Sequence, residues 1–404
     1  MPDPRPFLIV AASARALAAS ARNSGYKAAA LDYFCDTDLA DVTTARERVA
    51  QDAGGGFDAD ALVSAVERLA PAGSKPAWGL VYGSGFEDRP GLLERLASGR
   101  RLFGNSPDVL ARAKDPGRLA ALLDGLAIPH PETRLKPPAP ERAHAWLVKR
   151  RGGAGGLHIR EARRSPEGAE AGGSGSLYYQ RRVAGRAVSA LVIGDGAAAR
   201  VLGFSAQWTC PWLPDQPFRF GGAVAPVPLP DPLRRKLADA AVRVAEELSL
   251  VGVNGVDFIV GETGRGFSMI EVNPRPGATV VVFDRGGPAS LFDLHVRAAA
   301  GALPALAPTG WFPPETAFAS AILYAEEETI IAGAFDWPEW TADRPAAAAR
   351  IGPGQPICTV FAESREAAPQ ARGRTPAERA RRLALCRTEA LRGTIRRCMQ
   401  SVPA

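Results

Sequence analysis

The chain begins with two short apolar runs separated by a helical pattern. Residues 7–12 are apolar, residues 14–23 are rich in alanine and arginine, and residues 28–33 are apolar except for Asp32. Such runs predict buried strands joined by a helix. Residues 78–82 predict a further strand of the same sheet. We therefore expect the chain to open with a doubly wound α/β domain.

Helical and extended patterns then alternate along the chain. A helical pattern begins at residue 105 and returns over residues 119–125, and the prolines at 129 and 131 end it. Apolar segments predict strands at 146–150, 177–183 and 188–194, and the spacing over 237–248 predicts an amphipathic helix. Residues 291–300 predict another helix, 316–362 predict strands, and the basic tail predicts a helix. Residues 167–176 are glycine-rich and predict a flexible loop.

The segment 252–277 predicts a β-hairpin that carries acidic side chains on one face. Residues 256–260 and 267–272 are apolar and β-branched or aromatic, and a glycine-rich turn separates them. With the turn centred near Gly264, Asp257 pairs with Glu271, and Asn273 lies on the same face. Three oxygen ligands are therefore expected on one surface.

Opposed carboxylates repel each other unless a cation lies between them. Magnesium prefers oxygen ligands and is commonly held by one or two carboxylates together with substrate phosphates. The hairpin therefore predicts a magnesium site beside a nucleotide triphosphate, with Arg275 as a fixed cation near the phosphates. The alternative is a solvated hairpin face, which the flanking apolar residues disfavour.

Two glycine-rich turns are candidate ligand sites. The turn after the strand at 78–82 contains Ser84 and Glu87, at a strand end where ligands often bind; a simple tight turn is an equal alternative. The strand at 146–150 brings Lys149 to a basic loop at 152–156, whose amide groups can contact phosphates. A mobile turn is the alternative there. Neither a P-loop nor the dinucleotide fingerprint G-x-G-x-x-G occurs.

Composition and charge indicate which classes of protein are not expected. The chain has 404 residues, 46 % of them hydrophobic, and a net charge of +6. No apolar run approaches the ~20 residues that span a bilayer, and no signal peptide is visible, so no membrane association is expected. Five scattered cysteines fit reduced thiols in the cytoplasm. Basic residues are not interleaved with aromatic ones, so nucleic-acid binding is not expected.

The order and spacing of these features resemble the ATP-grasp superfamily. The features are Lys114, Lys149 with its glycine loop, residues 180–185, and Asp257, Glu271, Asn273 and Arg275 of the hairpin. The resemblance implies an α/β protein with α+β lobes and the ATP-grasp fold. A doubly wound pre-ATP-grasp domain would span residues 1–110. The ATP-grasp domain would span 111–305, with a lid at about 130–185, and a strand-rich region with a basic helical tail would span 306–404.

The resemblance also implies roles for individual residues. Lys114 and Lys149 would contact ATP phosphates, and Arg275 would act with Lys149 in catalysis. One or two magnesium ions, or manganese in their place, would be ligated by Asp257, Glu271 and Asn273. The remaining contacts to ATP would come from the lid and the hinge, namely Gly152, Gly153, Gly155, Gly156, Gln180, Arg181 and Val183. Ala187 stands where many members carry a glutamate for the ribose.

Within the superfamily, the turn at 83–87 and the segment 218–222 are similar to predicted ATP-dependent carboligases related to biotin carboxylase, a group whose relatives include tyramine–glutamate ligase. This implies an ATP- and magnesium-dependent carboxylate–amine ligase that forms an amide through an acyl phosphate, for example an amino-acid ligase in cofactor biosynthesis. Its partners would be a small carboxylate and an amine, held near Ser84, Glu87 and Arg219. Whether the protein forms a homodimer is left open. A bicarbonate-using carboxylase and a degenerate ATP-binding regulatory module are the alternatives.

Overall fold

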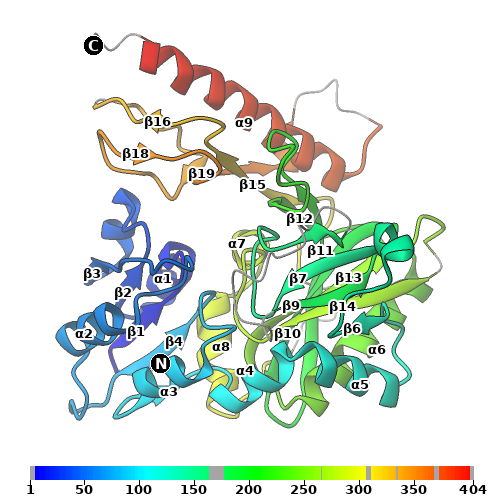
Figure 1. The fold of residues 1–404 in the computed structure, drawn as a ribbon. Helices are drawn as coiled ribbons and strands as arrows, with labels where there is room; N and C mark the ends of the chain where they lie inside the picture. Colours follow the sequence, from blue (N-terminus) through cyan, green and yellow to red (C-terminus); the bar gives the residue numbers. More distant parts are fainter. Residues whose placement is uncertain are drawn as a thin grey trace.

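Four β-sheets organise the computed structural model, which describes residues 5–162, 177–264, 266–305, 311–333, 335–367 and 373–400. The predicted loop at 167–176 lies outside these ranges. The N-terminal part and the central part lie side by side, and the C-terminal strands and long helix lie above both (Figure 1). No helix within the described ranges is long and apolar enough to cross a membrane.

The N-terminal sheet is parallel and has helices on both faces, which confirms the predicted doubly wound start. Its order is β3-β2-β1-β4-β5. Phe7 and Ile9 face one hydrophobic cluster, and Leu8 and Val10 face another, because side chains alternate along a strand. The elements are β1 (Phe7–Val10), α1 (Arg15–Asn23), β2 (Ala28–Asp32), η1 (Thr37–Val42), β3 (Ala45–Arg48), α2 (Ala59–Leu69), β4 (Gly79–Tyr82), α3 (Pro90–Ala97) and β5 (Arg101–Leu102).

The strand order reverses between β1 and β4, so the chain leaves these two neighbouring strands in different directions. Ligands of doubly wound sheets bind at such a switch point, outside the carboxyl ends of the strands. Here the ends are residues 11–13 after β1 and residues 83–85 after β4.

Two short helices connect this sheet to the rest of the chain. They are α4 (Pro107–Lys114) and α5 (Pro116–Gly125). The Asp115 carboxylate accepts hydrogen bonds from the amides of Gly117 and Arg118 at 2.9 Å, so it caps α5. The second helix therefore starts before the predicted residue 119, since Pro116 is well tolerated at a first helical position. Lys114 is left as the last residue of α4.

The largest sheet has eight strands in the order β14-β13-β10-β11-β12-β15-β19-β17. The C-terminal strands continue the central sheet, and the predicted domain boundaries stay predictions. Helix α9 contacts β15 and β19. The elements are β10 (Arg186–Asp195), β11 (Ala199–Thr209), β12 (Phe220–Ala225), α6 (Asp231–Glu247), β13 (Val251–Val260), β14 (Phe267–Asn273), α7 (Val280–Gly286), α8 (Leu291–Ala299), β15 (Phe318–Tyr324), β17 (Thr341–Ala342), β19 (Pro356–Glu363), η4 (Ser364–Glu366) and α9 (Pro376–Gln400).

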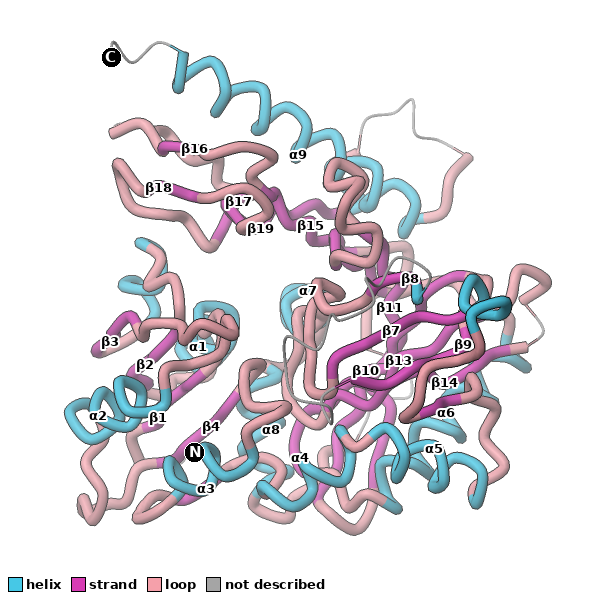
Figure 2. Tube along the Cα trace, viewed as in Figure 1, coloured by secondary structure: helices cyan, strands magenta, loops and turns pink. Residues whose placement is uncertain are grey.

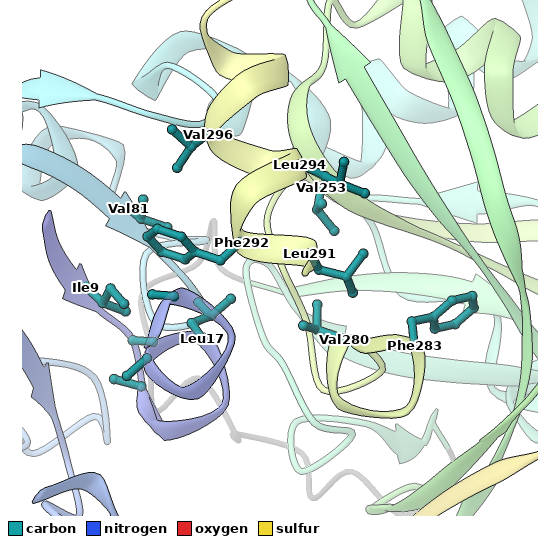
Figure 3. Close-up of a cluster of buried hydrophobic side chains, with 14 of the residues drawn as sticks. Ile9, Leu17, Val81, Val253, Val280, Phe283, Leu291, Phe292, Leu294 and Val296 are labelled. Carbon is teal, nitrogen blue, oxygen red and sulfur yellow. The ribbon is translucent and has the colours of Figure 1, made fainter. Parts of the chain in front are cut away.

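One apolar core joins the N-terminal sheet to the central sheet. Ile9 and Val81 of the N-terminal sheet lie near Phe292 of α8, while Leu291 and Phe283 point toward the central sheet (Figure 3). All five side chains are buried. Since large apolar side chains fill this contact, the switch point is held in a defined position relative to the hairpin β13–β14.

Two small sheets complete the fold. One has the order β6-β9-β7-β8, and its strands β7 and β9 lie in front of β13 and β14 in Figure 2. The other pairs β16 with β18. The elements are β6 (Thr133–Arg134), η2 (Pro140–Ala145), β7 (Trp146–Arg150), β8 (Arg160–Glu161), β9 (Leu177–Arg181), β16 (Thr329–Ile330) and β18 (Arg350–Ile351).

Candidate functional site

The hairpin β13–β14 pairs its two carboxylates as predicted. Asp257 lies directly opposite Glu271, and Asn273 lies opposite Gly255. The register then shifts, because Phe258 pairs with Met269 and leaves Ile270 as the extra residue of a β-bulge. The bulge returns Met269 to the core face, where it is fully buried. The opposite face therefore carries the polar groups.

Those polar groups form one hydrogen-bonded cluster. The Asn273 amide nitrogen donates to Asp257 Oδ2 at 2.8 Å, and Gln207 Nε2 donates to Asp257 Oδ1 at 3.4 Å. The Lys114 ammonium forms an ion pair with Glu271 and donates to Asn273 Oδ1 at 3.2 Å. Lys114 thus reaches the hairpin from the end of α4 and faces all the predicted metal ligands except Asp257.

Burial and nearby charges shift the pKa values of the two carboxyl groups in opposite directions. Burial, with the charge of Glu271, raises the pKa of Asp257. Burial alone would also raise the pKa of Glu271, but the cations Lys114 and Lys149 outweigh it and lower that pKa. A divalent cation at this position would favour the ionised form of Asp257 and so offset the effect of burial.

The residues of the hairpin fit a magnesium ion that is completed by phosphates. Within the described ranges, no group of three or more His, Cys, Asp or Glu side chains could hold a metal on its own. Two carboxylates and one amide oxygen are nevertheless the partial oxygen set that magnesium accepts when substrate phosphates and water fill the other positions.

Lys149 lies in the small sheet and points to the same cluster. Its ammonium is buried and donates to Gln180 Oε1 at 2.7 Å, and Gln180 Nε2 donates to the Ile270 carbonyl at 3.3 Å. Burial lowers the pKa of Lys149, while the charge of Glu271 opposes that shift. Gln180 therefore links the small sheet to the bulge of the hairpin.

Part of the predicted hinge already forms backbone hydrogen bonds with neighbouring segments. Gln180 and Arg181 belong to β9, which lies between β6 and β7. The Arg181 amide donates to the Glu132 carbonyl at 2.9 Å, and the Arg182 amide donates to the Ala145 carbonyl at 2.8 Å. The structure thus gives Gln180 a side-chain contact to Lys149, which the sequence did not predict. Val183 follows the strand.

The glycine-rich loop packs closely against two distant segments. Gly152 has φ +65°, and a Cβ there would lie 2.6 Å from the Asp88 backbone nitrogen. Gly156 has φ +79°, and a Cβ there would lie 1.7 Å from the Phe218 carbonyl oxygen. Side chains cannot be accommodated at such distances, and positive φ also favours glycine. The loop needs glycine at both positions to approach these segments.

A narrow pocket lies between the loop, the helix α5 and the hairpin. It is lined by Lys114, Gly152, Gly153, Gln180 and Glu271, together with apolar side chains such as Leu119 and Met269. Five of the predicted nucleotide or metal residues thus surround one space. Gly155, Gly156, Arg181 and Val183 are not among its lining residues.

Arg275 is buried and paired with the switch point. Its guanidinium donates from Nε to Glu87 Oε1 at 2.7 Å, and Nη2 lies 2.6 Å from the same oxygen. Glu87 Oε2 accepts from the Gly85 amide at 2.7 Å. Burial alone would raise the pKa of Glu87, but Arg275 and Lys114 lower it. The structure thus pairs this carboxylate with Arg275, and the contact between Glu87 and a substrate stays a prediction.

A buried amide network that the sequence did not point to supports the loop before Arg275. Asn105 Nδ2 donates to Asn254 Oδ1 at 2.7 Å and to the Pro274 carbonyl at 2.8 Å. The Tyr82 hydroxyl donates to the same carbonyl at 3.2 Å. The only signal in the sequence is Asn254, a polar residue in an apolar strand.

A second cavity of about 270 Å³ lies at the switch point. Its walls come from the ends of β1 and β4, the loop after Arg275, and the C-terminal strands β15 and β19. Ser84 and Arg219 line it as expected, whereas Glu87 does not. Asp36 and Asp343 also line it and were not expected. The cavity reaches Gly277, two residues beyond Arg275, so it adjoins the hairpin cluster.

Comparison with known structures shows a shared fold. The biotin carboxylase domain of 2-oxoglutarate carboxylase from Hydrogenobacter thermophilus, solved with MgADP and bicarbonate, is 17% identical, with a TM-score of 0.68 over 88% of this chain and 85% of that chain. N5-carboxyaminoimidazole ribonucleotide synthetase from Thermotoga maritima is 18% identical, with a TM-score of 0.64 over 95% of this chain and 98% of that chain. At such identities the similarity concerns the fold alone.

Sequence comparison locates the family within the chain. D-alanine–D-alanine ligase from Syntrophotalea carbinolica is 48% identical over 54 residues, which is 13% of this chain and 17% of that ligase. The match thus spans less than a fifth of the length of that enzyme. Residues 113–279 match the family model of an ATP-grasp domain. Residues 113–279 therefore form an ATP-grasp domain, and the chain as a whole has the ATP-grasp fold.

Proposed function

We propose that this protein is an ATP- and magnesium-dependent carboxylate–amine ligase that forms an amide through an acyl phosphate. The observation that carries the proposal is the hairpin cluster. Asp257, Glu271 and Asn273 form a partial oxygen shell beside two buried or nearly buried ammonium groups, Lys114 and Lys149. Such an arrangement suits the phosphates of a nucleotide with its metal.

The narrow pocket is the proposed nucleotide site. Lys114 lines the pocket, and Lys149 lies behind the lining residue Gln180; both would neutralise phosphate charge. The amides of Gly152 and Gly153 would donate to phosphate oxygens. Leu119 and Met269 give the pocket an apolar wall that suits the base. Gln180 orients Lys149, since its Oε1 accepts from the ammonium at 2.7 Å.

Magnesium, held by Asp257, Glu271 and Asn273, would neutralise charge on the phosphates during transfer. The residues of the chain do the positioning. Arg275, fixed by Glu87, lies between the hairpin and the switch-point cavity and would stabilise the phosphoryl group as it passes from one to the other. A reaction of this kind needs no protein nucleophile.

The switch-point cavity is the proposed carboxylate site. A carboxylate oxygen of the substrate would attack the terminal phosphorus of ATP, the bond to ADP would break, and an acyl phosphate would form. An amine would then attack the acyl carbon, phosphate would leave, and the amine would lose a proton. Arg219 lines this cavity and supplies a cation for a carboxylate. The glycine-rich loop would keep out water, which otherwise hydrolyses the acyl phosphate.

A carboxylase that activates bicarbonate is the second candidate, because biotin carboxylases are among the similar structures. The cavity of about 270 Å³ is much larger than bicarbonate needs, which favours a larger carboxylate. The domain from Hydrogenobacter thermophilus was solved as a dimer, and a homodimer stays a prediction for this chain.

The test is a screen for ADP release by the full chain with magnesium, ATP and pairs of carboxylates and amines, with bicarbonate in a separate arm. We expect ADP release that requires both a carboxylate and an amine, and an amide product by mass spectrometry. Glu271→Gln should abolish the release. Stimulation by bicarbonate without an amine would favour the carboxylase, and nucleotide binding without turnover in any arm would favour a regulatory module.

A further inference from the structure

Asp36 is a buried acid that lines the switch-point cavity and has no side-chain partner among the described residues. It stands just before η1, and only 8% of the residue is exposed. Within the described ranges its carboxylate accepts no hydrogen bond and forms no ion pair, whereas the nearby Asp38 accepts from the amides of Asp343 and Arg344 at 3.0 and 2.9 Å. A buried carboxylate without a partner is costly, so its presence on a cavity wall calls for a ligand.

The charges around Asp36 do not balance. Arg15 is paired elsewhere, since its Nε lies 2.8 Å from Asp343 Oδ1 and 3.7 Å from Asp38 Oδ2. Three carboxylates thus surround one guanidinium. Burial, followed by the charges of Asp343, Asp32 and Asp38, raises the pKa of Asp36 to about 8, and Arg15 opposes this only in part. Without a ligand this wall therefore favours the neutral, protonated form of Asp36, and a bound cation would favour its ionised form.

The other wall carries a cation that is not paired with an acid. Arg219 lies 4.8 Å from the centre of the Tyr324 ring, and its buried Nε has no hydrogen-bond partner. No ion pair of Arg219 occurs within the described ranges. Arg219 and Asp36 line the same cavity without contacting each other, so one molecule with two opposite charges could reach both.

We propose that the molecule bound in this cavity carries a cationic nitrogen group, an ammonium or a guanidinium, which Asp36 holds while Arg219 holds its carboxylate. The inference rests on the proposed function, in which that carboxylate becomes an acyl phosphate. It adds the substrate class, which is an acid that also carries an amino or guanidino group. Charge-assisted hydrogen bonds would give Asp36 the partner it lacks. A metal ion alone matches this wall less well, because the described part of the chain contains no cluster of three or more His, Cys, Asp or Glu side chains that could hold one.

Calorimetric titration of the full chain without nucleotide tests the proposal. Hexanoate is the reference probe. Norleucine, 6-aminohexanoate and 4-guanidinobutanoate add a cationic group at different places, and adipate adds a second carboxylate instead. We expect at least one cationic probe to bind at least tenfold more tightly than hexanoate and adipate. Asp36→Asn should remove that tenfold preference, while Asp41→Asn should keep it, because Asp41 is exposed on the same 3-10 helix.

Proton release gives an independent reading. At pH 7.5 an acid with a pKa near 8 is mostly protonated, and binding of a cation would ionise it. Titrations in phosphate and in Tris should therefore differ in apparent enthalpy for wild type and agree for Asp36→Asn. The charged and titratable groups that face Asp36 are Asp32, Asp38, Asp343 and Arg15, together with the thiols of Cys35 and Cys358.

The proposal is overturned if hexanoate or adipate binds as tightly as every cationic probe, if no cationic probe binds, or if Asp36→Asn leaves the preference unchanged. Thermal unfolding of Asp36→Asn checks that the variant is folded. Failure of the ligase proposal would instead appear as absent ADP release in the screen described above, which this titration does not measure. Glu271→Gln should bind the probes as wild type does, since Glu271 does not line this cavity.

Discussion

Arg275 and Glu87, 188 positions apart in the chain, form a buried ion pair in which two guanidinium nitrogens lie 2.7 and 2.6 Å from one carboxylate oxygen. The pair connects the loop after the hairpin to the switch point of the N-terminal sheet. It therefore joins the proposed phosphate site to the proposed substrate cavity.

Glu87→Gln should destabilise the protein, because it leaves the buried Arg275 guanidinium without a counter-charge. Removing one partner of a buried pair costs about 3–5 kcal/mol, and a glutamine that still accepts a hydrogen bond should recover part of this. Urea unfolding measures the loss, with Glu94→Gln as an exposed control. In a double-mutant cycle with Arg275→Gln, purely additive effects would contradict a coupled pair.

Two glycines of the loop allow a matched comparison. Gly155 and Gly156 both have positive φ, but a Cβ at Gly155 meets nothing within 4 Å, whereas one at Gly156 would collide with the Phe218 carbonyl. Strain should be similar in the two alanine variants, and only Gly156→Ala should displace the loop. We expect Gly156→Ala to raise the KM for ATP about tenfold or more relative to Gly155→Ala, a factor that corresponds to about 1.4 kcal/mol. Equal KM values would show that the contact with Phe218 is unimportant.

Gln180 should control the charge of Lys149. Gln180→Leu leaves a buried ammonium without its acceptor, at a cost of about 1–3 kcal/mol, and should lower the pKa of Lys149 further. Gln180→Glu should raise that pKa. Affinity for ADP, followed against pH, should therefore fall at a lower pH in the leucine variant than in wild type, and at a higher pH in the glutamate variant. Three identical profiles would argue against this positioning role.

Asp36→Asn should become more stable than wild type as the pH rises. The folded state raises the pKa of Asp36 to about 8, so wild type loses stability as the pH rises from about 4 to about 8, and the asparagine variant does not. The difference should reach a few kcal/mol at pH 8, because each pKa unit corresponds to about 1.4 kcal/mol. Chemical unfolding at several pH values checks this. A difference in stability that does not change with pH would contradict the burial of an unpaired acid.

Magnesium should add to the stabilisation that ADP provides. A ligand at 100 times its Kd stabilises the folded state by about 2.7 kcal/mol, so Tm should rise more with ADP and magnesium than with ADP and EDTA. Glu271→Gln and Asn273→Ala should lose the magnesium-dependent part and keep the part due to ADP alone. If both variants respond to magnesium as wild type does, the hairpin is not the metal site.

The sequence by itself determined the local architecture. Alternating faces and a glycine-rich turn were enough to place Asp257 opposite Glu271, because residues on paired strands are related by simple counting from the turn. Apolar runs likewise predicted the parallel N-terminal sheet. The bulge at Ile270 was not predictable, since a single extra residue leaves no clear trace in the hydrophobic pattern.

Only the tertiary structure decided which distant groups meet. The pairing of Glu87 with Arg275 and the position of Asp36 on a cavity wall depend on how the N-terminal sheet packs against the rest of the fold. The contact between Gln180 and Lys149 depends on the pairing of β9 with β7 in the small sheet. Such contacts join residues far apart in the chain, and local propensity carries no information about them. The buried core around Phe292 fixes that packing, and with it the geometry of the site.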